Sequence, residues 1–185
     1  MENNSSRLSL EGEYPLALKP ISEFPGNNVL QQIDQDNEKF LKTSAIWHDP
    51  VDVEELDGIG LELRRQDLKI SLLMEMVSEL LIQQSHLPPM VHIHLTATDL
   101  LCDYPSDHSS DRPNIQLAPG TKLELKLYVM PAFPRPLKLY GEVVPEREPG
   151  KLSIHFSGMS PAVQDRIEKV IFTHHRRSIA HRLGG

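Results

Sequence analysis

The sequence contains histidines that could serve as metal ligands. His92 and His94 lie two residues apart, so they share one face if the segment is a strand, and His155 belongs to a later segment. Three imidazoles brought together could hold zinc. The alternative is that they are ordinary polar residues at outward strand positions. We favour the alternative and predict no metal site.

Nucleophilic chemistry has one candidate, the single cysteine Cys102. A lone cysteine cannot form an internal disulfide, which fits a reducing compartment such as the cytoplasm. Nothing near it in the sequence would lower its pKa. The chain also lacks the His-Glu-x-x-His, Gly-x-Ser-x-Gly and glycine-rich phosphate-loop motifs. We therefore predict no catalytic residues and no cofactor, so the protein is not predicted to be an enzyme.

Basic side chains gather near the C-terminus, in the stretch His174-His175-Arg176-Arg177 and at Arg182. This cluster could bind an anion or an acidic segment of a partner. Alternatively it is a solvated helix end, where the helix dipole favours cations. The sequence leaves both readings open and favours the second.

Acidic residues dominate the N-terminal third, which explains the formal net charge of −7. Residues 1–60 hold twelve Asp and Glu against four Lys and Arg, and the remainder is nearly neutral. No basic face large enough for a phosphate backbone is visible, so we expect no nucleic acid partner. No apolar run is long enough to cross a bilayer, and we expect no membrane insertion.

A long helix follows from the spacing of apolar residues between positions 56 and 80. At intervals of three and four, the seam of this helix consists of Leu56, Ile59, Leu63, Gln66, Ile70, Leu73, Val77 and Leu80. A period of 3.5 residues keeps one seam against a partner helix over several turns. Gly58 and Gly60 weaken the first turn, so we expect the helix from about Leu61 to Ser85. The alternative is an amphipathic helix packed on its own domain.

Three regions are predicted around this helix. Residues 1–27 read as a flexible leader because Pro15, Pro20 and Pro25 interrupt any pattern. Residues 28–87 form a helical oligomerisation region, in which a short helix from Asn28 could lie beside the long one. Residues 88–185 alternate with period two in several segments and end in a helix capped by Ser160. These features predict an α+β protein with a small antiparallel barrel or sandwich and a C-terminal helix.

The order of these segments resembles that of PilZ domains. Pro119-Gly120-Thr121-Lys122-Leu123-Glu124-Leu125 is similar to the PGTxLEL strand, and Gly141-Glu142-Val143-Val144 to the following GxVV strand. Leu152-Ser153-Ile154-His155-Phe156 resembles the next strand, xGVxF. The closing stretch, residues 165–177, and the heptad helix resemble the atypical, tetramer-forming branch. The resemblance implies a six-stranded barrel, no catalysis and a role in cyclic di-GMP-related signalling.

The chain departs from both ligand motifs of typical PilZ domains. The RxxxR motif has no counterpart, because no arginine lies between Ser85 and Val91. The D/NxSxxG motif aligns with His94, Thr96 and Asp99, which places a carboxylate where a glycine should admit phosphate. The resemblance therefore implies that the usual cyclic di-GMP site is missing.

Two functions from different classes remain. The first is a non-catalytic regulatory scaffold that assembles through the seam, as a tetramer in preference to a dimer, and contacts a protein partner in signalling. The second is a true cyclic di-GMP receptor that uses a relocated basic site. The candidates for that site are Arg176, Arg177 and Arg182, or Arg64 and Arg65.

Overall fold

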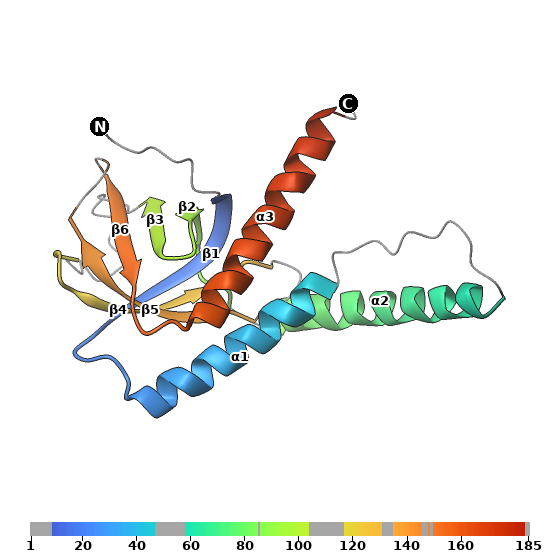
Figure 1. Ribbon diagram of the computed structural model, residues 1–185, viewed down its shortest axis with the longest axis horizontal. Helices are drawn as coiled ribbons and strands as arrows, with labels where there is room; N and C mark the ends of the chain where they lie inside the picture. Colours follow the sequence, from blue (N-terminus) through green and yellow to red (C-terminus); the bar gives the residue numbers. More distant parts are fainter. Residues whose placement is uncertain are drawn as a thin grey trace.

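Six antiparallel strands close into a barrel, and three helices surround it (Figure 1). The computed structural model describes residues 9–46, 58–84, 86–103, 117–130, 135–145, 148 and 150–183. Its elements in chain order are β1 (Leu10–Ile21), α1 (Asn27–Ile46), α2 (Gly58–Gln84), β2 (Met90–Leu95), β3 (Asp99–Asp103), β4 (Lys122–Leu127), β5 (Leu137–Val144), β6 (Lys151–Phe156) and α3 (Pro161–Leu183).

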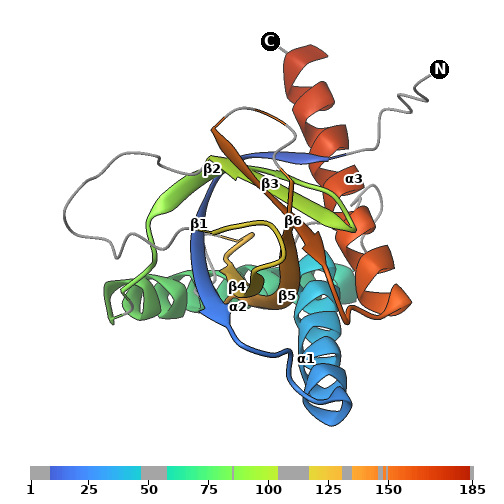
Figure 2. The ribbon, with the colours of Figure 1, turned by 90° about the vertical axis from the view of Figure 1, so that its left-hand side faces the viewer.

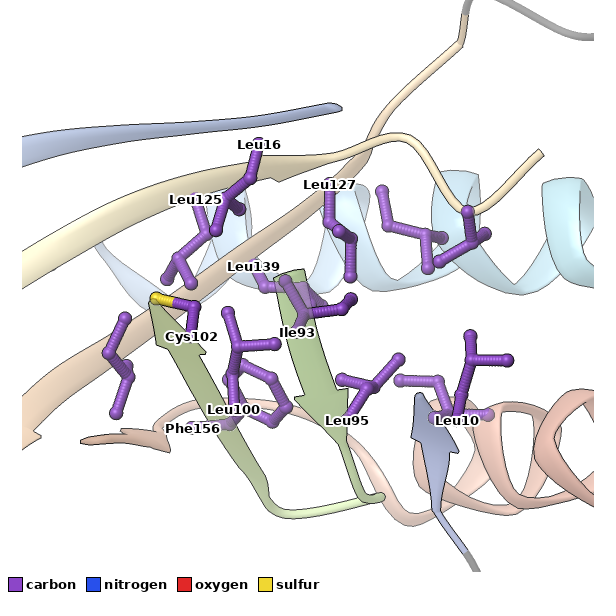
Figure 3. Close-up of a cluster of buried hydrophobic side chains, with 14 of the residues drawn as sticks. Leu10, Leu16, Ile93, Leu95, Leu100, Cys102, Leu125, Leu127, Leu139 and Phe156 are labelled. Atoms are coloured by element: carbon purple, nitrogen blue, oxygen red, sulfur yellow. The ribbon is translucent and has the colours of Figure 1, made fainter. Parts of the chain in front are cut away.

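The predicted fold class is confirmed. The strands neighbour one another in the order β1-β2-β3-β6-β5-β4, and the pairing of β4 with β1 closes the barrel. Alternation along β4 explains why the segment is a strand, because Leu123, Leu125 and Leu127 are fully buried while the residues between them are partly exposed. Figure 3 shows such side chains, from β1 to β6, meeting inside the barrel.

The prediction of a flexible leader over residues 1–27 is wrong for β1, and residues 1–8 lie outside the described part. The first half of β1 pairs with β2 and its second half pairs with β4, so this strand closes the barrel. The barrel therefore draws on residues from Leu10 onward, not only on 88–185.

The prolines that hid β1 lie at or beyond the ends of its ladders of hydrogen bonds. The N–H of Leu16 donates to the carbonyl oxygen of Pro89 at 3.2 Å, so even-numbered amides of β1 point to the β2 side. Pro20 faces that side beyond the start of β2 at Met90. Pro15 faces the β4 side at the end of that pairing, where its carbonyl oxygen still accepts from the N–H of Tyr128 at 3.1 Å. A proline is tolerated in a strand under these conditions.

Helices α1 and α3 pack against each other, α1 also contacts β5, and α3 also contacts β1. Figure 2 shows both helices on the same side of the barrel. The predicted start of α3 is confirmed, since the N–H of Val163 donates to the Ser160 hydroxyl at 3.4 Å. Among the described residues α1 does not pack on α2, so the predicted pairing of these two helices is wrong there.

Asn37 joins α1 to the barrel with a pair of hydrogen bonds. Its amide Nδ2 donates to the carbonyl oxygen of Lys138 at 2.8 Å, and its Oδ1 accepts from the Lys138 N–H at 3.2 Å. The pairing of β5 with β6 begins only at Gly141, so this stretch of β5 lacks a strand on that side. The buried Asn37 side chain supplies the missing partner.

Replacing Asn37 by alanine is expected to lower the free energy of unfolding by about 2 kcal/mol, because both backbone groups of Lys138 lose their partner in a part-buried place. Urea denaturation followed by circular dichroism measures this change. Gln35→Ala on the same helix is the control, because Gln35 is exposed. Equal stability of the two variants would show that the Asn37 hydrogen bonds contribute nothing.

Candidate functional site

The α2 helix projects away from the barrel (Figure 1). Within the described residues it packs against none of the other helices or strands. It nevertheless carries most of the large exposed apolar side chains of this part of the chain: Leu63, Leu68, Ile70, Leu72, Leu73, Met76, Val77, Leu80 and Leu81. Apolar area of this extent on the surface of a domain marks an interaction surface. No described helix combines the length and hydropathy needed to span a membrane.

The described seam residues lie on this projecting helix as the sequence predicts. Leu63 is 62% exposed, Ile70 52% and Leu73 61%, and Val77 and Leu80 are comparably open. Gln66 interrupts the seam and donates to the Glu62 carboxylate at 3.3 Å. Ile59 belongs to α2, but its side chain lies outside the described part, as does the whole of Leu56. The alternative that α2 packs on its own barrel gains no support from these residues.

Sequence reasoning missed part of the apolar surface of α2. Leu68 and Leu72 are 64% and 58% exposed and lie outside the seam. The signal that could have found them is their four-residue spacing, which places them on a common face with Met76. The helix therefore presents apolar side chains in more than one direction.

The turn between β2 and β3 carries Thr96 and Asp99, which the sequence alignment above places at the second ligand motif, and its polar side chains form hydrogen bonds with one another. The hydroxyl oxygen of Thr96 accepts from the N–H groups of Thr98 and Asp99, at 3.3 and 3.0 Å. The Thr98 hydroxyl donates to the Asp99 carboxylate at 2.7 Å. The other oxygen of Asp99 lies 3.0 Å from Nδ1 of His155 on β6. This arrangement holds a carboxylate in the turn.

The structure does not bring His92, His94 and His155 together as a metal site. His155 lies beside Asp99 on β3, whereas Nε2 of His92 faces Glu11 of β1 at 3.8 Å. In the described ranges no three His, Cys, Asp or Glu side chains are grouped as metal ligands. The arrangement of the described residues therefore does not support the zinc alternative.

Cys102 lies inside the barrel and is 2% exposed (Figure 3). Burial raises the pKa of its thiol to about 12, and the nearby Asp103 carboxylate adds to the rise. The thiol is therefore protonated at neutral pH and is no nucleophile. The hydroxyl of Ser153, also buried, has no hydrogen-bond partner among the described residues.

The basic end of α3 extends beyond the barrel toward the C-terminus (Figure 1). The Arg176 guanidinium lies 5.9 Å from the centre of the Phe172 ring, and both side chains are exposed. Arg177 and Arg182 belong to the helix, but their side chains lie outside the described part. The structure thus leaves both readings of this cluster open.

Comparison with known proteins agrees with this geometry. Residues 49–183 match a family described as "tPilZ: Atypical PilZ domain, cyclic di-GMP receptor". No curated protein matches the chain. A similar solved structure is that of a pathogenic protein from Xanthomonas campestris, described as a new tetrameric PilZ domain self-assembled via an unusual helical bundle. The two share 21% sequence identity with a TM-score of 0.66, over 95% of this chain and 92% of the other.

Proposed function

The chain belongs to the atypical PilZ domain family, and from this premise we propose that it is a non-catalytic scaffold in cyclic di-GMP-related signalling. Copies of the chain assemble through the seam of α2, and each copy presents its barrel to protein partners. The proposal places the scaffold in the cytoplasm, the reducing compartment that suits one unpaired cysteine.

The observation that carries this proposal is the exposure of the seam on a helix that stands off the barrel. Five described aliphatic residues of the seam have side chains that are about half exposed or more: Leu63, Ile70, Leu73, Val77 and Leu80. Burying each of them is worth about 1.5–3 kcal/mol. Their sum is comparable with the rigid-body cost of association, about 4–15 kcal/mol, so neighbouring apolar residues must be buried too.

Four copies are the proposed assembly. Leu81 and Met76 widen the apolar surface of α2 beyond what one partner helix covers, which favours more than two helices. The Xanthomonas campestris protein is described as a tetramer formed through a helical bundle, and its fold is similar. Gln66 would form a polar layer that fixes the register of the bundle, at some cost in stability.

The scaffold proposal assigns no cyclic di-GMP to the usual site. The sequence has no arginine between Ser85 and Val91 to clamp the phosphates. At the other half of that site, the Asp99 carboxylate is fixed by Thr98 and His155. A phosphate that approached this turn would be repelled by the negative Asp99 carboxylate, at the position where the typical motif has a glycine.

Isothermal titration with cyclic di-GMP at moderate salt is expected to show no submicromolar binding. The missing arginine pair removes several charge-assisted hydrogen bonds, each worth about 1.5–3 kcal/mol. A submicromolar dissociation constant would overturn the proposal in favour of the receptor. The double variant Arg176→Ala with Arg177→Ala would then locate the relocated site, with Arg64→Ala and Arg65→Ala as the matched pair on α2.

A further inference from the structure

The outer face of strands β1, β4 and β5 carries three lysines that have no carboxylate partner. They are Lys19, Lys126 and Lys138, and each directly follows an apolar residue that belongs to the barrel core or packs against it, so its side chain points outward. In the described ranges no ion pair involves any of the three. Three other lysines have a carboxylate oxygen at 2.7–2.8 Å: Lys42, Lys151 and Lys169.

Lys126 and Lys138 lie directly opposite each other across β4 and β5. The N–H of Tyr128 donates to β1, so the even-numbered amides of β4 point away from β5. The N–H of Lys138 likewise points away from β4, because it donates to Asn37. The two lysines therefore form a non-hydrogen-bonded pair, in which the Cα atoms are about 4.5 Å apart and the side chains are closest. Like charges at directly opposite positions destabilise a sheet.

This part of the barrel is open to a ligand. Among the described elements β4 contacts only β1 and β5, so no described helix covers it. The nearest carboxylate along β4, that of Glu124, lies opposite Tyr140. Burial raises the pKa of the Tyr140 hydroxyl, and the Glu124 carboxylate adds to the rise, which indicates that this carboxylate lies near Tyr140. It makes no ion pair with Lys126.

An aromatic pair lies beside the lysines. Tyr140 follows Lys138 by two residues on β5 and therefore points to the same face. The ring of Phe24 meets the Tyr140 ring edge to face, with 6.4 Å between their centres, and Nζ of Lys122 lies 5.3 Å from the centre of the Phe24 ring. Both rings are partly exposed. Aromatic side chains of this kind anchor protein interfaces.

The charges around the lysine pair favour an acidic protein segment over a continuous polyanion. Glu124 and Glu142 lie in the next two rows of the same face, and both would repel a run of phosphates that crossed it. The net charge of −7 also opposes long-range attraction of nucleic acid or an anionic membrane. A protein segment can place carboxylates over the lysines and apolar side chains over the aromatic rings.

We propose that this lysine face, formed by Lys19, Lys126, Lys138, Phe24 and Tyr140, is the docking surface for an acidic segment of a partner protein. Neighbouring carboxylates of that segment bridge Lys126 and Lys138 and remove their mutual repulsion. The inference rests on the proposed function, in which each copy presents its barrel to protein partners, and it names the face and the chemistry of the partner.

Binding of a fluorescein-labelled poly-glutamate peptide, followed by fluorescence anisotropy, tests the lysine face. Lys126→Gln with Lys138→Gln is expected to raise the dissociation constant about tenfold, the effect of losing two exposed charge contacts. The matched control is Lys151→Gln with Lys169→Gln, which removes the same charge from lysines that already have partners. It is expected to bind like the wild type. Equal weakening in both double variants, or no binding by the wild type, would overturn the proposal.

Thermal stability separates a binding role from a structural one. Lys126→Gln with Lys138→Gln is expected to keep or raise the melting temperature, because the substitution removes a like-charge pair and keeps most of each side chain. Circular dichroism measures the transition. A lower melting temperature together with unchanged peptide binding would show that the two lysines serve the fold and would refute the docking surface.

Two further probes and the mass of the assembly complete the test. If Lys126 and Lys138 bind oligothymidylate, or vesicles of phosphatidylserine and phosphatidylcholine, more tightly than the peptide, the face serves nucleic acid or a membrane and the proposal fails. Light scattering on the same samples reports assembly separately. A monomeric wild type that binds the peptide through these lysines would sink the scaffold and support the face. An assembled wild type that binds no peptide would sink the face alone.

Discussion

Replacing Ile70 and Val77 by aspartate is expected to dissociate the assembly and yield a smaller species, down to the monomer of 21.0 kDa where no other contact holds it. Both side chains belong to the seam and are about half exposed in the single chain. In a bundle each would be buried, so every copy would have to bury two carboxylates without partners. Such burial costs several kcal/mol per charge, which exceeds what the remaining seam residues supply. Light scattering at micromolar concentration measures the mass.

The single variant Ser71→Asp controls for the added charge, because it places a carboxylate on the same helix at an exposed position outside the seam. It is expected to keep the wild-type mass. Circular dichroism checks that α2 remains helical in each variant. A wild-type protein that is monomeric at this concentration would refute the scaffold, and a double variant of unchanged mass would refute the seam as its interface.

Gly141→Ala is expected to destabilise the barrel by about 1–3 kcal/mol, the usual cost of forcing extra atoms into a packed interior. An added Cβ would lie 2.6 Å from the backbone oxygen of His155 and 2.7 Å from Cγ2 of Ile154. Gly141 begins the ladder between β5 and β6, so the two strands would have to separate where their pairing starts. In a chain of this length the melting temperature should fall by about 2–4 °C per kcal/mol.

The matched control for this substitution is Gly26→Ala. An added Cβ at Gly26 meets no atom within 4 Å, so it causes no steric conflict. The remaining effect of the substitution is on the start of α1, which follows Gly26. Alanine at the start of a helix costs no more than about 1 kcal/mol relative to glycine. Similar melting temperatures for the two variants would show that β5 and β6 adjust to the extra methyl group without loss.

The strands and the long helix were predictable because their patterns are local. Leu123, Leu125 and Leu127 alternate within six residues, and the seam repeats within α2 at a helical period. Period-two and period-3.5 patterns indicate an element with one apolar face, whatever the rest of the chain does. Pro161 after Ser160 likewise marks the start of α3 with local chemistry alone.

The parts that failed depend on contacts distant in sequence. Pro15 and Pro20 argue against a strand in the sequence, and only the positions of β2 and β4 show that both prolines lie at or beyond the ends of the ladders. The contact of Asn37 with Lys138 spans 101 residues, and that of Asp99 with His155 spans 56. No sequence pattern in one segment predicts the distant residue that it contacts. The packing of α1 was missed for the same reason. Its apolar face could contact either α2 or the barrel and α3, and the sequence does not distinguish the two.

The position of β1 has a consequence for any attempt to isolate the recognisable part of this protein. The family match begins at residue 49 and therefore excludes the strand that closes the barrel. A fragment cut to that match would leave β2 and β4 with unpaired backbone groups along one side. Exposed strand edges of this kind recruit other chains and drive aggregation. A fragment that starts before Leu10 keeps both strands paired, so the smallest unit expected to fold intact is longer than the part that matches the family.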